Sequence, residues 1–577
     1  MKKLLRYLKG YEKETILAPL FKMLEAAFEL IVPLVVAGIV DVGIKNHDTV
    51  YIWRMCAVMV LLGVIGLVCS LTAQYFSAKA AMGFSTALRD DLFAHISRLS
   101  YRELDKLGTP TLVTRITSDI NQAQTGVNLV LRLFLRSPFI VAGAVIMAFT
   151  INLQVTVIFV TAVPLISLVI YLIMKWTVPI YKKVQSSLDR ISLITRENHV
   201  GARVVRAFGR QAEENADFSE TNDEYTRIQI AAGKISALLN PATYVIMNLS
   251  IVAILWFGSR QVYVGVLTQG EVVALVNYMS QILLALLALA NLIVAVTKAL
   301  ASAARLNEVF DTQPTLTDEG SIPQTEKAAE ARVEFRNVTF AYAGTQEPAL
   351  SGISFTAAPG ETIGIIGGTG CGKSTLVNLI PRFYDITEGK ILVDGNPVQD
   401  YPFAQLRSKV GMVPQRAVLF KGTIRENMKW GREDATEQEI DQALAIAQAK
   451  EFVESKPEKL DTMVSQGGAN LSGGQRQRLT IARALVGMPE ILIMDDSASA
   501  LDFATDAALR HAIREQTEGM TVFLVSQRAT SIKQADKILV LDDGCLAGVG
   551  THQELLQACE VYREICLSQL SEQEVNR

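Results

Sequence analysis

Long stretches without a charged side chain restrict the fold of this 577-residue chain more than any other feature. Residues 55–78, 235–259 and 272–297 are each uncharged, and each is long enough to cross a bilayer as one helix. Residues 137–174 are also uncharged but are too long for a single crossing. We therefore expect two helices there, joined by a tight outer turn near Ile151–Gln154.

One more span is predicted at about residues 16–40, which completes a set of six. Lys22, Glu25 and Glu29 interrupt it and follow three- and four-residue steps, so they share one helix face. Ionisable groups at membrane depth favour a functional role. The alternative is that this stretch lies near the cytoplasmic headgroups, where Lys22 pairs with Glu25 and all three stay hydrated. If Glu29 faces a central cavity, it would favour cationic amphiphiles as cargo.

Positive charge near the helix ends predicts the orientation. Basic residues precede the first span, so the N-terminus is expected in the cytoplasm, together with residues 79–136, residues 175–234 and everything after Lys298. The N-terminal MKKLLRYLKGYEK lacks a continuous apolar core and a small-residue cleavage site. It therefore favours an amphipathic helix on the cytoplasmic face over a signal peptide. We expect a multi-pass protein of the cell (plasma or inner) membrane.

The two inner segments are long and helix-forming, with breaks at Gly108–Pro110 and around Gly201. We expect membrane helices that continue into the cytosol and turn through short transverse helices at about residues 100–108 and 205–213. These turns either dock on another domain or are solvated connectors.

Composition excludes several classes of function. The net charge of −3 offers no basic footprint for nucleic acid. The six cysteines contain no CxxC pair and the five histidines are scattered, so neither a zinc site nor a histidine metal cluster is predicted.

The character of the chain changes at residues 313–331, where two prolines and small polar residues replace the apolar runs. This composition predicts a linker. Short β-branched strands then alternate with helical patterns, as expected of an α/β domain. We therefore expect a transmembrane domain at 1–312, a linker at 313–331 and an α/β domain at 332–577.

The motif GGTGCGKST follows the apolar run TIGII and precedes a helical pattern, which is the strand–loop–helix setting of a phosphate-binding loop. Glycines let backbone N–H groups curl around phosphates, Lys373 meets their charge, and Ser374 can ligate Mg²⁺. The residues predicted to bind ATP in this loop are Gly367, Gly368, Thr369, Gly370, Cys371, Gly372, Lys373, Ser374 and Thr375.

Two further elements complete this pattern. The apolar strand ILIMD delivers Asp495 to its tip, where a carboxylate can hold Mg²⁺. Between the phosphate loop and that strand lies LSGGQ, in which Ser472 and two glycines open a helix that can bind an anion at its N-terminus.

LSGGQ in this position, after six spans, resembles an ABC exporter half-transporter, and the resemblance covers essentially the whole chain. It implies six transmembrane helices followed by an α/β P-loop ABC nucleotide-binding domain, with ATP and Mg²⁺ as cofactors. It also implies that residues 100–108 and 205–213 are coupling helices. Two chains would sandwich two ATP molecules, each between one chain's phosphate loop and the other chain's LSGGQ.

The resemblance assigns roles to further residues. Tyr342 in FAYAG is the aromatic that stacks on adenine, and Gln415 in MVPQ reaches Mg²⁺ and senses the membrane domain. The signature that faces the opposite ATP consists of Leu471, Ser472, Gly473, Gly474 and Gln475. The loop that touches the opposite nucleotide domain consists of Ser499, Ala500, Leu501 and Asp502.

Three positions depart from the family pattern. The general-base glutamate after the Mg²⁺ aspartate is replaced by Asp496, whose carboxylate is one methylene shorter. The histidine that contacts the γ-phosphate is replaced by Gln527, and Gln466 stands where many relatives have glutamate. Because a general base needs the right geometry before anything else, the two catalytic changes suggest a site that binds ATP and hydrolyses it poorly. The alternative is that Asp496 still works after a small shift of backbone or water.

A homodimer would contain two weakened sites, so the chain resembles the subunit of heterodimeric bacterial multidrug exporters that carries the degenerate site. We expect a partner half-transporter that supplies the glutamate and the histidine. The rival interpretations are a homodimeric lipid or peptide exporter with slow ATPase activity, and an ATP-gated channel or sensor subunit. Lipophilic or drug-like cargo is implied by the family resemblance alone.

Polar residues in the last two spans could line a cavity or could hydrogen-bond between helices. They are Asn240, Tyr244 and Asn248 in the fifth span and Asn277, Gln281 and Asn291 in the sixth.

Overall fold

The computed structural model describes residues 2–318, 320, 330–345, 347–497 and 500–570. The chain divides into two compact units. The first comprises residues 1–97 and 110–312, and the second comprises residues 98–109 and 313–577. Of the predicted linker, residues 319 and 321–329 lie outside the described residues.

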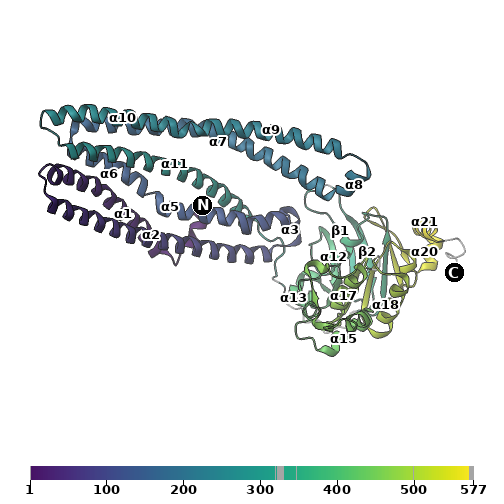
Figure 1. Ribbon diagram of the computed structural model, residues 1–577. Helices are drawn as coiled ribbons and strands as arrows, with labels where there is room; N and C mark the ends of the chain where they lie inside the picture. Colours follow the sequence, from purple (N-terminus) through teal and green to yellow (C-terminus); the bar gives the residue numbers. More distant parts are fainter. Residues whose placement is uncertain (1, 319, 321–329, 346, 498–499, 571–577) are drawn as a thin grey trace. The chain divides into compact units, whose positions relative to one another are not determined.

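Within the described residues, six helical segments of the first unit are long and apolar enough to cross a membrane, which confirms the six predicted spans (Figure 1). The segments are Glu12–Ile44, Thr49–Arg98, Thr109–Ile151, Leu153–Val200, Gln211–Tyr263 and Gln269–Asp311. Their elements are α1 (Glu12–Gly38), η2 (Ile39–Ile44), α2 (Thr49–Arg98), α4 (Thr109–Thr114), η3 (Arg115–Asp119), α5 (Ile120–Leu133), α6 (Arg136–Ile151), α7 (Leu153–Val200), α9 (Gln211–Ala237), α10 (Leu239–Tyr263) and α11 (Gln269–Asp311). Short helices η1 (Lys2–Leu8), α3 (Tyr101–Leu107) and α8 (Ala202–Ala207) accompany them.

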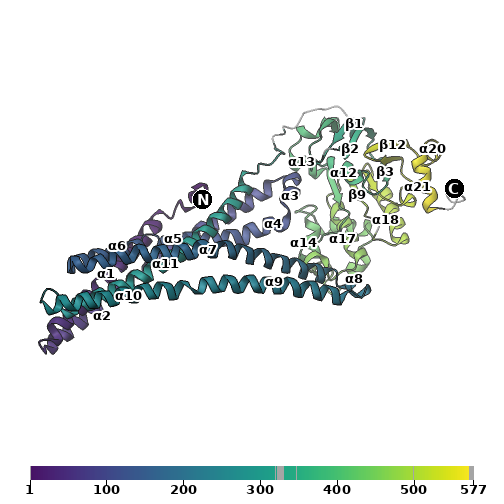
Figure 2. The ribbon, with the colours of Figure 1, turned by 90° about the horizontal axis from the view of Figure 1, so that it is seen from above.

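The last membrane helix, α11, is the packing centre of the first unit and contacts α1, α5, α6 and α10. An added Cβ at Gly126 of α5 would lie 2.2 Å from the Cβ of Ala299 on α11, so only glycine allows these two backbones to approach so closely. Figures 1 and 2 show α7 alongside α9 and α10. In the most apolar window of α2 only 6% of the residues are buried, against 39% in α11.

The turn between α6 and α7 agrees with the sequence prediction, whereas the position of the short helix α8 differs from it. Asn152 separates α6 from α7, and its side-chain oxygen accepts hydrogen bonds from the backbone N–H groups of Gln154 and Val155, which confirms the predicted turn between these two spans. The transverse helix α8 begins at Ala202, earlier than the predicted 205–213. It ends before Gly209, whose φ of 65° a helix cannot continue.

The second unit contains an antiparallel sheet in the order β2-β1-β4-β5 and a larger sheet in the order β12-β11-β3-β10-β9-β6, as the described residues have them. The strands are β1 (Val333–Phe340), β2 (Leu350–Ala357), β3 (Thr362–Gly367), β4 (Glu388–Val393), β5 (Asn396–Pro397), β6 (Val410–Val413), β7 (Gly422–Thr423), β8 (Met463–Val464), β9 (Ile491–Asp495), β10 (Thr521–Val525), β11 (Lys537–Asp542) and β12 (Cys545–Gly550). The helices are α12 (Lys373–Leu379), η4 (Val398–Asp400), α13 (Phe403–Ser408), α14 (Ile424–Lys429), α15 (Glu437–Ile446), α16 (Lys450–Glu454), η5 (Lys459–Asp461), η6 (Gln466–Gly468), α17 (Gly473–Leu485), α18 (Phe503–Gln516), α19 (Ala529–Ile532), α20 (His552–Ala558) and α21 (Glu560–Gln569).

Parallel pairing brings the loops of interest to one edge of the larger sheet. Val525 at the end of β10 pairs with Asp495 on one side and with Ile365 on the other. Because ligands of open α/β sheets bind beyond the carboxyl ends of the parallel strands, this edge is the expected site.

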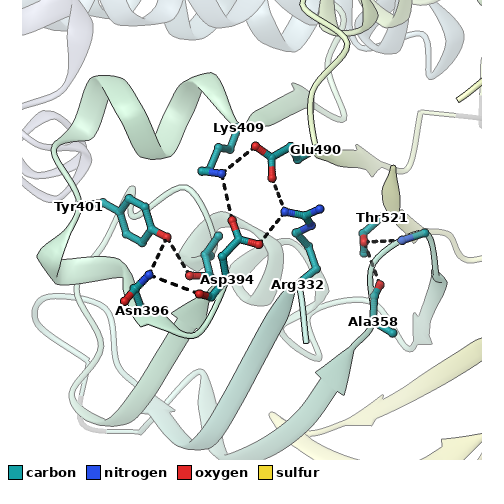
Figure 3. A network of polar contacts seen from close by, with 10 residues as sticks. Arg332, Ala358, Asp394, Asn396, Tyr401, Lys409, Glu490 and Thr521 are labelled. Atoms are coloured by element: carbon teal, nitrogen blue, oxygen red, sulfur yellow. Dashed lines mark hydrogen bonds and ion pairs between the residues drawn. The ribbon is translucent and has the colours of Figure 1, made fainter. Parts of the chain in front are cut away.

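A network of four alternating charges lies between the first strands of the second unit and the residues that precede β6 and β9 (Figure 3). Asp394 accepts from Arg332 at 2.6 Å and from Lys409 at 3.0 Å. Glu490 accepts from Lys409 at 2.7 Å and also pairs with Arg332. Each of the four charged side chains pairs with two side chains of opposite charge. The network therefore connects the two sheets and leaves none of its four charges uncompensated.

Candidate nucleotide site

The phosphate loop runs from the end of β3 to the start of α12, as the sequence predicts for this motif. Gly370 and Gly372 have φ values of 86° and 94°, in the left-handed region that favours glycine. A Cβ added at Gly372 would lie 2.7 Å from the side chain of Leu350 and 2.8 Å from the carbonyl oxygen of Ala349. At Gly368 and Gly370 an added Cβ would meet nothing within 4 Å, so the backbone is uncrowded at these two positions. This backbone can curl around a phosphate group.

Lys373 is buried at the base of the loop. Its Nζ donates hydrogen bonds to the carbonyl oxygens of Gly367 at 3.0 Å and Gly368 at 2.6 Å, and it lies 3.7 Å from the Sγ of Cys371. These partners are neutral and do not compensate a positive charge, so the side chain is suited to meet an anion in the loop.

Ser374 and Asp495, the two residues predicted to hold Mg²⁺ most directly, are brought together. The hydroxyl of Ser374 donates to Oδ1 of Asp495 at 3.0 Å. Burial raises the pKa of the Asp495 carboxyl, the hydrogen bond from Ser374 lowers it, and neighbouring Asp496 raises it again, with a net upward shift. A buried carboxylate whose charge is this unfavourable is suited to a cation, so this oxygen pair fits Mg²⁺.

Asp496 lies one residue further along, beyond the end of β9. Its backbone N–H donates to the carbonyl oxygen of Val525 at 3.0 Å, and its φ is 45°. The third predicted metal ligand, Gln415, lies at the same edge of the sheet. Its Nε2 donates to Oδ2 of Asp496 at 3.5 Å, so it contacts the residue next to Asp495.

Gln527 follows β10 at the same edge and is exposed. Its backbone carbonyl oxygen accepts from Nε2 of Gln569 at 2.8 Å, which fixes the backbone of this position.

Tyr342 lies beside the phosphate loop. Its phenolic oxygen is 3.0 Å from Oγ1 of Thr375, and its ring meets those of Phe340 and Tyr384 edge to face, with centroid distances of 4.9 and 5.4 Å. An aromatic ring fixed here is suited to stack on a planar base.

The LSGGQ segment opens α17. Ser472 is its N-cap: its Oγ accepts from the N–H of Gln475 at 3.3 Å, and its own N–H donates to Oε1 of Gln475 at 3.0 Å. Leu471 is buried, and an added Cβ at Gly473 would meet nothing within 4 Å, so this glycine presents bare backbone. At Gly474 an added Cβ would lie 3.4 Å from the carbonyl oxygen of Ala500.

The loop after β9 is described only in part. Ser499 lies outside the described residues. Leu501 is buried, whereas Asp502 is the N-cap of α18 and accepts from the N–H of Thr505 at 3.1 Å. Gln466, the mildest departure from the family pattern, begins the short helix η6.

In the membrane unit, Lys22 pairs with Glu25 at 2.5 Å, as one of the alternatives states. The two side chains are largely buried, however, with exposed fractions of only 7% and 13%. Lys22 also donates to Oγ of Ser70 at 3.0 Å. This burial disagrees with the alternative in which Lys22 and Glu25 stay hydrated, and the position of the pair near the headgroups stays a prediction.

Glu29 has a partner that sequence reasoning missed. Arg136, at the start of α6, donates to both carboxylate oxygens of Glu29 at 2.9 and 2.8 Å. Arg136 directly precedes the uncharged run at 137–174, and its place at that border was the available signal. Of the polar candidates in the last span, Gln281 donates to the carbonyl oxygen of Glu29 at 3.2 Å, so it hydrogen-bonds between helices.

Two further residues were missed from the sequence, namely Tyr384, whose ring contacts that of Tyr342, and its partner Asp105. Tyr384 donates from its hydroxyl to Oδ2 of Asp105 at 2.7 Å. Asp105 belongs to α3, which falls in the same compact unit as the nucleotide site. Nothing in the spacing of these residues signals the contact.

Comparison with known proteins agrees with this geometry. A family described as "ABC transporter transmembrane region" matches residues 15–286, and one described as "ABC transporter" matches residues 350–499. The chain is 37% identical over 569 residues to the "Uncharacterized ABC transporter ATP-binding protein YfiB" of Bacillus subtilis, which covers 99% of this chain and 98% of that protein. It is 32% identical over 576 residues to an "ATP-dependent lipid A-core flippase" of Chromobacterium violaceum, covering 99% of this chain and 97% of that protein.

Among solved structures, the chain matches one titled "Structure of a bacterial Atm1-family ABC exporter with ATP bound" with a TM-score of 0.80 and 27% identity. The match covers 97% of this chain and 99% of the other. Domains of this kind bind ATP with Mg²⁺ and couple its hydrolysis to transport. The chain therefore belongs to the ABC transporter family, as a half-transporter of an ATP-driven exporter with six membrane helices followed by a nucleotide-binding domain.

Proposed function

We propose that this chain is one subunit of a heterodimeric exporter that moves lipophilic or drug-like compounds out of the cell by alternating access. Its own phosphate loop binds ATP and hydrolyses it poorly. Its LSGGQ completes the competent site of a partner half-transporter. The observation that carries the proposal is Asp496 at the position of the general base.

The geometry around Asp496 supports a weakened base. The aspartate carboxylate is one methylene shorter than glutamate, and one of its oxygens already accepts from Gln415 at 3.5 Å. The neighbouring position, Gln527, has an amide in place of an imidazole. General base catalysis contributes roughly 10²–10⁴ in rate, so a base out of reach of its water loses most of this factor.

Nucleotide binding does not depend on these two positions. Ser374 and Asp495 would hold Mg²⁺, which when bound neutralises charge on the phosphates. Lys373 contributes its ammonium group, Tyr342 offers a ring to the base, and Gln415 would join the metal after leaving Asp496. Together these residues supply the contacts to metal, phosphate and base that binding of ATP requires.

The partner chain is expected to supply the catalytic glutamate and histidine. Each ATP would lie between the phosphate loop of one chain and the LSGGQ of the other. Hydrolysis at the site built from the partner's phosphate loop and this chain's LSGGQ then resets the transporter. ATP in the weakened site persists through several cycles.

Cargo chemistry is part of the proposal. Glu29 would attract a cation if it were uncompensated, but it is paired with Arg136 through two hydrogen bonds. This pairing removes the argument for a specifically cationic cargo and leaves lipophilic compounds as the proposed class.

The test is ATPase activity of the chain alone and together with its partner, each with and without Asp496→Glu plus Gln527→His. We expect negligible activity alone, and activity with the partner that does not require the double substitution. Strong activity from the chain alone would contradict the proposal.

A second candidate is a homodimeric lipid exporter in which Asp496 works as a slow base. The observation in its favour is the whole-length similarity to proteins named lipid A-core flippases at 32% identity. It predicts that the chain alone moves a fluorescent phospholipid across vesicle membranes with ATP, and that Asp496→Asn stops this movement.

A further inference from the structure

The short helix α3 is held by hydrogen bonds near both of its ends, to two different parts of the second unit. At its N-terminus, Glu103 accepts from Oγ1 of Thr315 at 3.0 Å, and Oγ of Ser100 lies 3.1 Å from the same hydroxyl. At its C-terminal end, Asp105 accepts from the hydroxyl of Tyr384 at 2.7 Å. The two contacts reach different parts of the chain. Thr315 lies in the stretch after α11, whereas Tyr384 lies in the nucleotide-binding domain.

Tyr384 is also in contact with the residue proposed to stack on adenine. Its ring meets that of Tyr342 edge to face at 5.4 Å and 84°, and it lies 5.6 Å from the ring of Phe340. On its other side it lies 6.0 Å from the ring of Tyr101 in α3, which packs against Phe383 at 4.7 Å. A single side chain therefore contacts both the base-binding ring and α3.

Burial raises the pKa of the Tyr384 phenol, and the hydrogen bond to Asp105 raises it further. The hydroxyl therefore keeps its proton at neutral pH and acts as a donor. Because the ring is rigid, its tilt determines where the O–H group points. A change in the position of the Tyr342 ring is thus transmitted to the hydrogen bond with Asp105.

We propose that Tyr384 is a positioning residue through which the nucleotide base, rather than the phosphates, controls the seating of α3. A base stacked on Tyr342 fixes that ring, the ring holds Tyr384 by its edge-to-face contact, and Tyr384 holds Asp105. The inference rests on the proposed function in one respect, namely that Tyr342 receives the base of ATP.

The proposal has a thermodynamic consequence that separates base from phosphate. If the base site and the seating of α3 are coupled, then loosening α3 weakens binding of any ligand that carries the base. A polyphosphate without a base occupies only the loop around Lys373 and Ser374 and gains nothing from Tyr384. Its affinity is expected to be independent of the contact with Asp105.

The experiment measures the dissociation constants of Mg²⁺–ATP and of Mg²⁺–tripolyphosphate by calorimetry, using the full chain in lipid nanodiscs. Tyr384→Phe removes only the hydroxyl, and Asp105→Ala removes the acceptor from the other side. The matched control is Tyr401→Phe, whose hydroxyl donates to the carbonyl oxygen of Val393 at 2.9 Å in the same domain.

We expect both variants to weaken ATP binding by about two- to fivefold, as the loss of one partly exposed hydrogen bond does, and to leave tripolyphosphate unchanged. The double variant should be no weaker than either single one, because both remove the same contact. Hydrogen exchange of α3 peptides should slow when ATP binds to the wild-type chain, but not when tripolyphosphate binds and not in Tyr384→Phe.

Equal shifts for both ligands, or shifts for neither, would overturn the inference and leave the proposed function intact. Failure of the wild-type chain to bind ATP while it still binds tripolyphosphate would instead show that no base site exists at Tyr342. That result removes the proposed function and the inference together.

Discussion

The two adjacent aspartates at the end of β9 differ in almost every physical respect. Asp495 is buried, paired with Ser374 and held in regular strand geometry with Val525 opposite it. Asp496 is half-buried, has left the strand with a φ of 45°, and accepts a long hydrogen bond of 3.5 Å from the side-chain amide of Gln415. One position is fixed by the sheet and the other lies beyond it.

Under the proposed function, this difference would allow a nucleotide site to keep binding while its hydrolytic residues change. Lys373, Ser374 and Asp495 occupy positions that the sheet and the glycine loop impose, so the fold itself places their side chains in the site. Asp496 and Gln527 lie where the strands have ended, and other side chains can be accommodated there. The changed residues are found at these tolerant positions.

The largest effect is expected on ATP affinity, from a substitution among the residues that the fold holds in place. Lys373→Ala removes the buried ammonium group, and we expect ATP affinity to fall by roughly 100-fold, the equivalent of a charge-assisted hydrogen bond. Calorimetry on the full chain measures it. The control is Lys429→Ala, an exposed lysine at the end of α14. A loss below about fivefold would mean that the loop does not hold phosphate through this residue.

Asp495→Asn should have opposite effects on stability and on binding. The folded chain retains the Asp495 proton at pH values where the unfolded chain has released it, because the folded pKa is raised. Stability without ligand therefore falls as the pH rises from about 4 through that folded pKa, and asparagine removes the loss. We expect the variant to be more stable by about 1 kcal/mol at pH 7, and to lose the stabilisation that Mg²⁺–ATP gives.

The measurement is thermal unfolding at several pH values, with and without Mg²⁺–ATP. Asp502→Ala provides the contrast, since that carboxyl caps α18 and the hydrogen bonds from Thr505 hold its pKa below the usual range. Its removal should destabilise the chain. A destabilised Asp495→Asn would show that the carboxylate is not strained by burial.

Features that local physics imposes could be predicted from the sequence. The six spans follow from the need to satisfy backbone groups in lipid, and the outer turn at Asn152 follows from the length of the uncharged run. The phosphate loop is equally local, because its glycines and Lys373 lie within a few residues of each other. Proximity of Ser374 to Asp495 could be expected from parallel strands that end at one edge.

Features that depend on which helices meet could not be predicted. Arg136 pairs with Glu29 because α6 packs on α1, and the burial of Lys22 depends on Ser70 in α2. The contact of Tyr384 with Asp105 joins residues far apart in the chain. The start of α8 at Ala202 shows a different limit, since both Gly201 and Gly209 can end a helix and the sequence does not say which governs the turn.

The left-handed backbone of Asp496 predicts a smaller effect, on stability, that also distinguishes it from Asp495. Short polar residues tolerate this conformation better than longer ones, so Asp496→Glu should destabilise the domain by about 0.5–1 kcal/mol although it restores the family residue. Asp496→Gly should have little effect on stability. Thermal unfolding of both variants tests this, and an unchanged stability of Asp496→Glu would mean that the loop relaxes at no cost. In that case the site can be restored without a stability penalty.

The smallest expected effect is the most informative. In the proposed assembly with a partner, Asp496→Asn should change ATPase activity by less than about twofold, whereas loss of a working general base costs roughly 10²–10⁴. Asparagine is nearly the same size and tolerates the left-handed φ, so it removes the carboxylate charge without disturbing the loop. The matched variant changes the partner's proposed glutamate to glutamine and should abolish turnover. If Asp496→Asn instead abolished turnover, the two aspartates would both be essential, and the contrast between a fixed binding residue and a dispensable neighbour would no longer hold.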